Sequence, residues 1–230
     1  KQILLDYQDD NLLANVMVNL SLVYRHLKQY DNALDYIRQA LILFDKAGNL
    51  NGKGVALYRL SLIYEEAGEY DKAIKSIREA EQVFLQTGND YFLNTVYNAL
   101  GNWCLKEDLP DEALEYLNKT LAYANTVDDK GLLATTYHNM SEAYFQKNNN
   151  TTSLNYLKQA ENIYHKIGDK RHLQDVFLDY IEIYGYNNKP DSIVKYLIAY
   201  KELSDSLINE QTINAVAEIQ EKYQAEKKEK

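Results

Sequence analysis

The residues that most often carry chemistry form no recognisable active site in this sequence. The segment Gly48-Asn49-Leu50-Asn51-Gly52-Lys53 has the glycines and the lysine of a phosphate-binding loop. In such a loop four residues separate the glycines, and a serine or threonine follows the lysine to bind a magnesium ion. Here three residues separate the glycines, and another glycine follows the lysine. We therefore interpret the segment as a turn between two helices.

Cysteine, histidine and carboxylate side chains give no better candidate for chemistry. Cys104 is the single cysteine, so it has no disulfide partner within the sequence, and it occupies an apolar position of the repeat described below. No two of the four histidines have the spacing of metal ligands on one helix, because a predicted turn separates even His165 from His172. Adjacent acids such as Glu65 and Glu66 are typical of solvated helix faces. The sequence predicts no enzyme activity, no metal site and no cofactor.

The composition indicates a folded domain without a membrane span. With 46% hydrophobic and 26% charged residues, two prolines and nine glycines, the chain is unlike collagen or a disordered region. No apolar run approaches the roughly 18 residues of a membrane span, so we expect no membrane insertion by this segment. A net charge of −9 argues against nucleic acid as a partner. Because the sequence opens at Lys1, without methionine, we expect it to be a fragment of a longer protein.

The sequence repeats itself every 40 residues, without insertion or deletion. One column of the repeat holds Leu20, Leu60, Leu100, Met140 and Tyr180. Another holds Tyr24, Tyr64, Cys104, Tyr144 and Tyr184. Two more hold Ala33, Ala73, Ala113, Ser153 and Ile193, and then Ile37, Ile77, Leu117, Leu157 and Leu197. Such self-similarity predicts a stack of like units whose core exists only between neighbours.

Each repeat is predicted to form two helices joined by short polar turns. The apolar stripe of the first helix has the spacing i, i+3, i+4, i+7, as in Met17, Leu20, Ser21 and Tyr24. We expect one column of aspartates to cap the N-terminus of the second helix: Asp31, Asp71, Asp111 and Asp191. Pro110 and Pro190 are expected just before that cap. Left-handed glycines are expected to end the second helices at Gly48, Gly88 and Gly168.

These columns resemble the tetratricopeptide repeat (TPR), which has Trp, Leu, Gly and Tyr on its first helix and Ala, Phe and Pro on its second. The Trp position holds Met17, Leu57, Tyr97, Tyr137 and Phe177. The period is 40 residues instead of about 34, and the proline is missing, so we expect longer second helices. The resemblance implies an all-α, right-handed α-solenoid of five TPR-like helix pairs plus a C-terminal helix.

The predicted units follow from the repeat. We expect the end of a truncated preceding repeat at 1–13, four repeats at 14–53, 54–93, 94–133 and 134–173, a degenerate fifth repeat at 174–208, and a C-terminal capping or signalling helix at 209–230.

In the family that the repeat resembles, one face of the first helices lines a concave groove that binds ligands. Carried over to this sequence, the predicted peptide- or protein-binding residues are Asn15, Asn19, Tyr58, Arg59, Asn98, Asn102, His138, Asn139, Glu142, Asp179 and Glu182. Asparagine is a mediocre helix former, so its recurrence here favours binding, and its amide suits the backbone of an extended peptide. We expect a protein or an extended peptide as the partner.

The C-terminal segment resembles a junction in a bacterial family of membrane-linked histidine kinases and transcriptional regulators. In that family a TPR region leads through a charged helix, here ending in Glu226 to Lys230, to a membrane span and an output domain. The resemblance implies a non-catalytic sensor or scaffold region on the extracytoplasmic (periplasmic) side. A narrow apolar stripe, Ile213, Val216, Ile219 and Tyr223, favours either a helix that caps the last repeat or a homodimer through 209–230. A free-standing cytoplasmic adaptor, or a regulatory domain of an enzyme outside this fragment, remain as alternatives.

Overall fold

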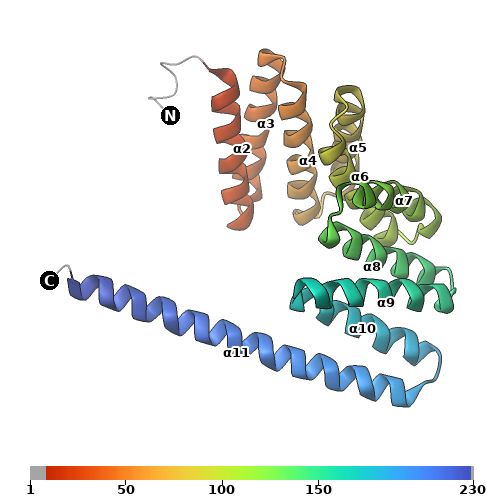
Figure 1. Ribbon diagram of the computed structural model, residues 1–230. Coiled ribbons are helices and arrows are strands. Elements are labelled where there is room, and N and C mark those ends of the chain that lie inside the picture. The colour runs from red at the N-terminus through yellow and green to blue at the C-terminus, as the bar shows by residue number, and fades with distance from the viewer. Residues whose placement is uncertain (1–8, 229–230) are drawn as a thin grey trace. The chain divides into compact units, whose positions relative to one another are not determined.

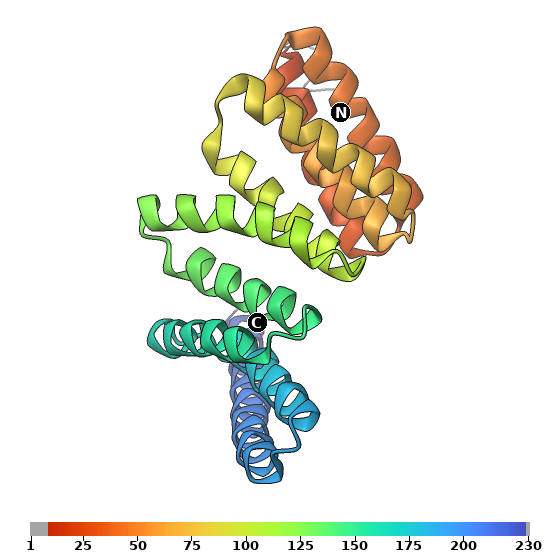
Figure 2. The same ribbon diagram turned by 90° about the vertical axis from the view of Figure 1, so that its right-hand side faces the viewer.

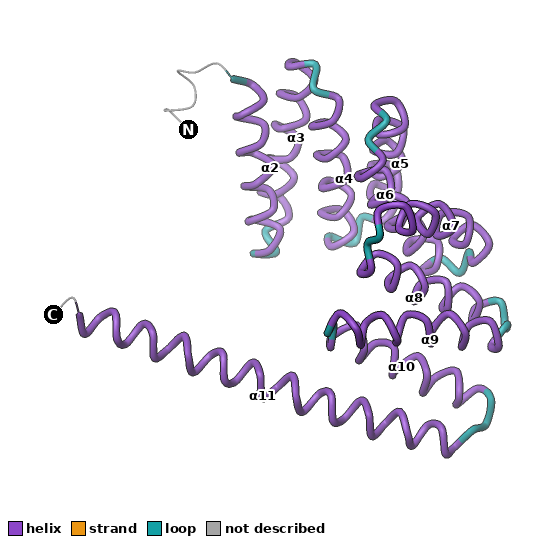
Figure 3. Tube along the Cα trace, in the orientation of Figure 1, coloured by secondary structure: helices purple, strands orange, loops and turns teal. Residues whose placement is uncertain are grey.

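The structure is a computed structural model that describes residues 9–228, with side chains up to residue 209. Throughout this range the secondary structure is α-helix, without a strand (Figures 1 and 3), which confirms the all-α prediction. The helices are α2 (Asp10–His26), α3 (Tyr30–Ala47), α4 (Leu50–Glu66), α5 (Tyr70–Thr87), α6 (Asp90–Lys106), α7 (Pro110–Val127), α8 (Lys130–Gln146), α9 (Asn150–Ile167), α10 (Lys170–Tyr186) and α11 (Pro190–Lys228).

The chain forms two compact units, Lys1–Tyr123 and Ala124–Lys230, which we call unit 1 and unit 2. In unit 1, α2 packs on α3 and α4 packs on α5, while α3 also contacts α4 and α5 contacts α6. In unit 2, α8 packs on α9, α9 on α10, and α10 on α11, an arrangement that Figure 2 shows from the side. Within the units, α4 therefore lies between the second helices α3 and α5, and α10 lies between α9 and α11.

The helix starts differ from the predicted unit boundaries. First helices begin at residues 10, 50, 90, 130 and 170, so the boundaries at 14, 54, 94, 134 and 174 lie four residues inside them. Residues 10–13 belong to α2, and residues 1–8 of the expected preceding repeat lie outside the described residues.

An asparagine or aspartate every 40 residues starts the first helices. These N-caps are Asp9, Asn49, Asn89, Asp129 and Asp169. In each case a side-chain oxygen accepts a hydrogen bond from the backbone N–H three residues later, at distances between 2.8 and 3.3 Å. The bond satisfies a donor that the helix itself leaves without a partner. This regular column of N-caps was not among the predictions from the sequence.

The aspartates predicted to cap the second helices do not cap them. Asp31 and Asp71 lie one residue inside α3 and α5, whose N-caps are Gln29 and Glu69 without a side-chain cap bond. Their carboxylates lie in the first turn instead, where their negative charge interacts favourably with the positive end of the helix dipole. Pro110 and Pro190 begin α7 and α11, rather than preceding a cap, because the first helical residue needs no N–H.

Glycine closes three of the second helices, as predicted. Gly48, Gly88 and Gly168 have φ values of 66°, 66° and 73°, in the left-handed region that glycine adopts without a steric penalty. The same column holds Ile208, and there the helix does not end. The C-terminal helix predicted at 209–230 is therefore continuous with the second helix of the fifth pair, and α11 has 39 residues. The side chains of its predicted stripe, residues 213–223, lie outside the described residues.

The repeat columns form the cores of the two units. Leu100, Cys104 and the alanine column Ala33, Ala73 and Ala113 are buried. Burial raises the pKa of the Cys104 thiol to about 11, which makes it an unreactive core side chain at neutral pH. Tyrosines fill the remaining space by stacking, as Tyr24 does on Tyr36 with ring centroids 5.2 Å apart. The interpretation of the tyrosines as packing residues agrees with this arrangement.

Candidate binding surface on the first helices

The residues predicted to bind a partner all lie on first helices, and we call them the first-helix row. Asn15, Asn19 and Glu182 are exposed, whereas Tyr58, Arg59, Asn98, Asn102, His138, Asn139, Glu142 and Asp179 are partly buried. Unit 1 presents those on α2, α4 and α6, and unit 2 presents those on α8 and α10. All of them are in contact with solvent to some extent, so the row can meet a ligand without unfolding.

Neighbouring first helices are linked by ion pairs or hydrogen bonds between polar side chains 41 residues apart in sequence. In unit 1, Arg25 Nε lies 3.6 Å from Glu66 Oε1, and Lys106 Nζ pairs with Glu65 Oε1. In unit 2, His138 Nε2 lies 2.5 Å from Asp179 Oδ2. A spacing of one repeat plus one residue is therefore the position at which opposite charges on successive first helices meet. Arg25 and Glu65 were not among the predicted site residues, although charge complementarity at this spacing would have revealed them.

In unit 1 the row combines an aromatic ring with positive charge. The Arg59 guanidinium lies 5.7 Å from the centre of the Tyr58 ring. Burial raises the pKa of the Tyr58 hydroxyl, against the opposing effect of Arg59 and Arg25, so the phenol stays neutral. The Asn15 amide donates to the Asn11 carbonyl oxygen within α2. Within the described residues, no hydrogen bond engages the amides of Asn19 and Asn102, which leaves both groups available to a ligand.

In unit 2 the row is acidic. Burial raises the pKa of the Glu142 carboxyl, and the negative charges of Asp179 and Glu182 raise it further. Gln146 Nε2 donates to Glu142 Oε1 at 3.1 Å. A ligand that brought a positive charge to these carboxylates would relieve their mutual repulsion. The arrangement therefore favours a cationic group over an anionic one.

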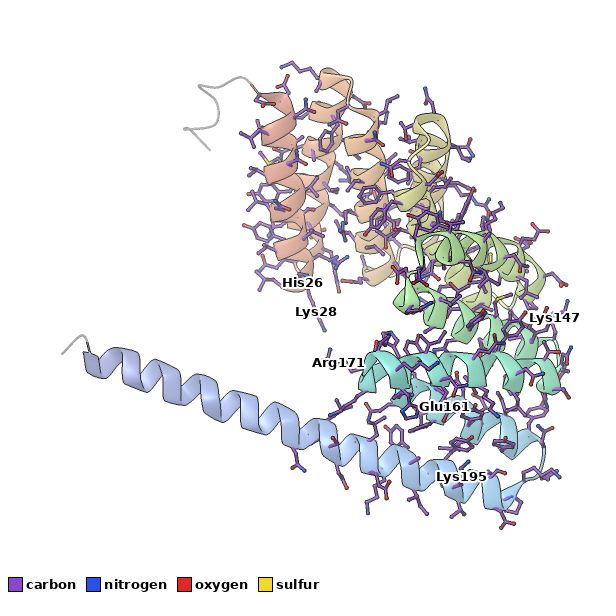
Figure 4. All side chains as sticks on the ribbon, in the orientation of Figure 1. His26, Lys28, Lys147, Glu161, Arg171 and Lys195 are labelled. Atoms are coloured by element: carbon purple, nitrogen blue, oxygen red, sulfur yellow. The ribbon has the colours of Figure 1, made fainter. Side chains whose placement is uncertain are left out.

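Side chains of α9 contact both neighbouring first helices, α8 and α10. The Tyr164 hydroxyl donates to Thr135 Oγ1 at 3.1 Å, and its ring meets the His138 ring edge to face, with centroids 6.3 Å apart. On the other side of α9, Glu161 Oε2 accepts a hydrogen bond from the Tyr180 hydroxyl at 3.0 Å. Figure 4 labels Glu161 on α9, between α8 and α11. His138 is thus fixed by both α9 and α10.

The described part of the chain has neither a candidate metal cluster nor a candidate membrane span. Within it, no three or more His, Cys, Asp or Glu side chains are grouped so that they could hold a metal ion. Nor does any described helix combine the length and the apolar character that crossing a membrane requires.

Comparisons with known proteins identify the repeat and the fold. The family model of the tetratricopeptide repeat matches residues 12–86 and again 92–166. No curated protein sequence matches the chain. Among solved structures, BtubC from P. vanneervenii is similar with a TM-score of 0.79 at 16% identity, over 88% of this chain and 85% of that one.

Two other similar structures are larger than the present chain. A Rap protein complexed with competence and sporulation factor has a TM-score of 0.70 at 13% identity, over 84% of this chain and 54% of that one. A signal transduction ATPase with numerous domains and a tetratricopeptide repeat sensor, from Pyrococcus horikoshii, has a TM-score of 0.62 at 18% identity, over 84% of this chain and 29% of that one. At such identities the likeness establishes the α-solenoid fold alone.

Proposed function

Because the chain belongs to the tetratricopeptide repeat family, a family of protein-interaction modules, we propose that the part of the first-helix row in each unit binds an extended peptide or a peptide-like segment of a partner protein. The observation that carries the proposal is the recurrence of asparagine on first helices of both units, at Asn19 and Asn102 in unit 1 and at Asn139 in unit 2, on faces that touch solvent. An amide offers a donor and an acceptor together, which matches the alternating groups of an extended backbone.

The acidic face of unit 2 supports a preference for basic ligands. Glu142, Asp179 and Glu182 lie on the row of this unit, and burial, followed by the negative charges of Asp179 and Glu182, raises the pKa of the Glu142 carboxyl. A lysine or arginine side chain of the bound peptide would stabilise these carboxylates, and we expect its affinity to fall as salt screens the attraction. In unit 1 the Tyr58 ring offers an apolar surface beside the Arg59 charge.

The role in the cell is a sensor or scaffold within a bacterial signalling or transcription regulator. Two similar structures support it: a Rap protein complexed with competence and sporulation factor, and a signal transduction ATPase with a tetratricopeptide repeat sensor. The resemblance of the C-terminal segment to the junction of membrane-linked regulators is what supports an extracytoplasmic location for this region. A cytoplasmic adaptor is the second candidate, because the same surface would serve an assembly scaffold equally well.

The binding proposal is tested by selecting peptides from a random display library against the full chain. A selected peptide is then measured by calorimetry against the triple variant Asn19→Ala, Arg59→Ala and Asn102→Ala. Each neutral hydrogen bond nets about 0.5–1.5 kcal/mol, so the three losses together should weaken binding by tenfold or more. The matched control is Lys75→Ala with Glu79→Ala, two exposed residues of the second helix α5. Equal affinity of the triple variant and the wild type, or loss of affinity in the control alone, would place the site elsewhere.

A further inference from the structure

The helix α11 exposes a face that the other second helices bury. In the column Ile37, Ile77, Leu117 and Leu157 the side chains are 0%, 6%, 0% and 0% exposed, whereas Leu197 in the same column is 48% exposed. Ile77 and Leu157 lie in clusters with residues of the following first helix, such as Val96 of α6 and Val176 of α10. No first helix follows α11 within the described residues. The position that a neighbouring helix fills elsewhere is therefore uncovered here.

Beside Leu197, α11 exposes a series of apolar and charged side chains with a defined pattern. Val194, Ile198 and Ile208 are 55%, 54% and 58% exposed, and Lys201 and Asp205, both exposed, lie between them. Successive members of this series are four, three, four and three residues apart, so they share one side of the helix. The opposite side packs against the core of unit 2 through Tyr196, Ala199, Tyr200 and Leu203. We call the series 194, 198, 201, 205 and 208 the α11 face.

We propose that the α11 face pairs with the α11 face of a second copy of this chain, antiparallel, about a two-fold axis at the level of residue 203. The axis places Ile198 opposite Ile208 of the second copy and Lys201 opposite Asp205 of the second copy. Symmetry makes each of these contacts twice, as in any interface where the same patch meets itself. A parallel pairing would set Lys201 against Lys201 and Asp205 against Asp205, and like charges in contact oppose association.

This self-complementarity is what selects a second copy as the occupant. The face carries one positive and one negative charge at positions that exchange under the two-fold axis, and large apolar side chains at positions that do the same. The interface is small, and we expect a reversible dimer with a dissociation constant on the order of micromolar. The contacts lie upstream of the 209–230 segment that the sequence suggested for a homodimer.

Sedimentation equilibrium of the full chain over a concentration series tests the pairing. The wild type should form a reversible dimer. Lys201→Asp should raise the dissociation constant about tenfold or more, because each contact then opposes two carboxylates, and Asp205→Lys should do the same with two ammonium groups. The double variant Lys201→Asp, Asp205→Lys should restore the dimer, since it exchanges the charges without removing either pair. An equimolar mixture of the two single variants should form a heterodimer, although neither forms a homodimer well.

Lys158→Asp, at an exposed position of α9, is the matched control because it changes the net charge by the same amount. It should dimerise as the wild type does, and all variants should keep the helical circular dichroism of the wild type, since both altered α11 positions are exposed. A wild type that stays monomeric throughout the series overturns the proposal. So does a double variant that remains as weak as the single ones, or a control that weakens as much as Lys201→Asp.

Discussion

Leu157 and Leu197 occupy the same position of the repeat, one in α9 and the other in α11, but their surroundings differ. Leu157 is fully buried in a cluster with Val176 and Phe177 of α10, whereas about half of Leu197 faces solvent. Both helices are second helices that pack against a preceding first helix. The difference arises on the other side, where α10 covers α9 and no described helix covers α11. Whether a side chain is buried in this fold therefore depends on the neighbouring repeat as much as on the residue type.

The largest expected effect comes from truncating the two leucines of this column. Leu157→Ala should lower the free energy of unfolding by about 2–5 kcal/mol, because it removes a fully buried side chain and leaves a cavity. Leu197→Ala should cost much less in dilute solution, where the α11 face is solvated. Chemical denaturation of both variants measures the difference. Equal losses would mean that α11 has a cover within the monomer.

Much of this fold could be predicted from the sequence, because the 40-residue columns state which positions are alike. The helix pairs, the buried alanines and the glycine ends at Gly48, Gly88 and Gly168 follow from the columns. The predicted N-caps of the second helices were wrong because an aspartate such as Asp31 or Asp71 suits both the N-cap and the first turn of a helix. Only the backbone conformation shows which of these two positions it occupies.

The candidate surface was less predictable from sequence. A column shows which residues share a helix face. The contact between His138 and Asp179, however, joins different columns of two successive repeats. It depends on the offset between adjacent helices, which the packing of large side chains sets. In the glycine column, Asp128 adopts a positive φ of 52° and α7 ends before it, whereas α11 continues past Ile208. A β-branched side chain disfavours the left-handed conformation more than aspartate does, and the column pattern alone does not give that difference.

Glycine substitutions sharpen the comparison between inner and terminal helices. A Cβ at Gly54 of α4 would lie 2.7 Å from the Phe84 ring, so Gly54→Ala should destabilise the fold by about 1–3 kcal/mol through overpacking. At Gly185 of α10, in the last helix pair, a Cβ meets nothing within 4 Å. Gly185→Ala should instead stabilise by up to about 1 kcal/mol, through the better helix propensity of alanine. Thermal unfolding compares the two, and the same sign for both changes would contradict the packing of α4.

Removal of a buried polar side chain from the inner core should have a smaller effect than Gly54→Ala, and of the opposite sign. Asn94 of α6 is buried in the column of Ala14, Gly54 and Ala134. Its Nδ2 donates to the Asp90 carbonyl oxygen at 2.7 Å, but its Oδ1 is buried without a hydrogen-bond partner among the described residues. Asn94→Ala removes that unsatisfied acceptor and adds helix propensity, so it should raise the free energy of unfolding by about 0.5–2 kcal/mol. Asn139→Ala on the partly buried row should show no such gain, and equal gains at both positions would mean that propensity alone is responsible.

The smallest expected effect depends on pH and concerns the row of unit 2. Burial, and then the charge of Asp179, raises the pKa of the Glu142 carboxyl in the folded chain. The folded state thus binds the proton more tightly than the unfolded state, so the stabilisation from protonation is complete below the unfolded pKa and is lost as the pH rises through the folded pKa. Glu142→Gln imitates the protonated form at every pH and keeps the oxygen to which Gln146 donates. Urea unfolding should therefore give similar stabilities for variant and wild type in acid, and a growing advantage of the variant as the pH rises to neutrality. The control Glu107→Gln, at an exposed residue, should show a difference from wild type that is independent of pH, and the same independence for Glu142→Gln would contradict the crowding of carboxylates on this row.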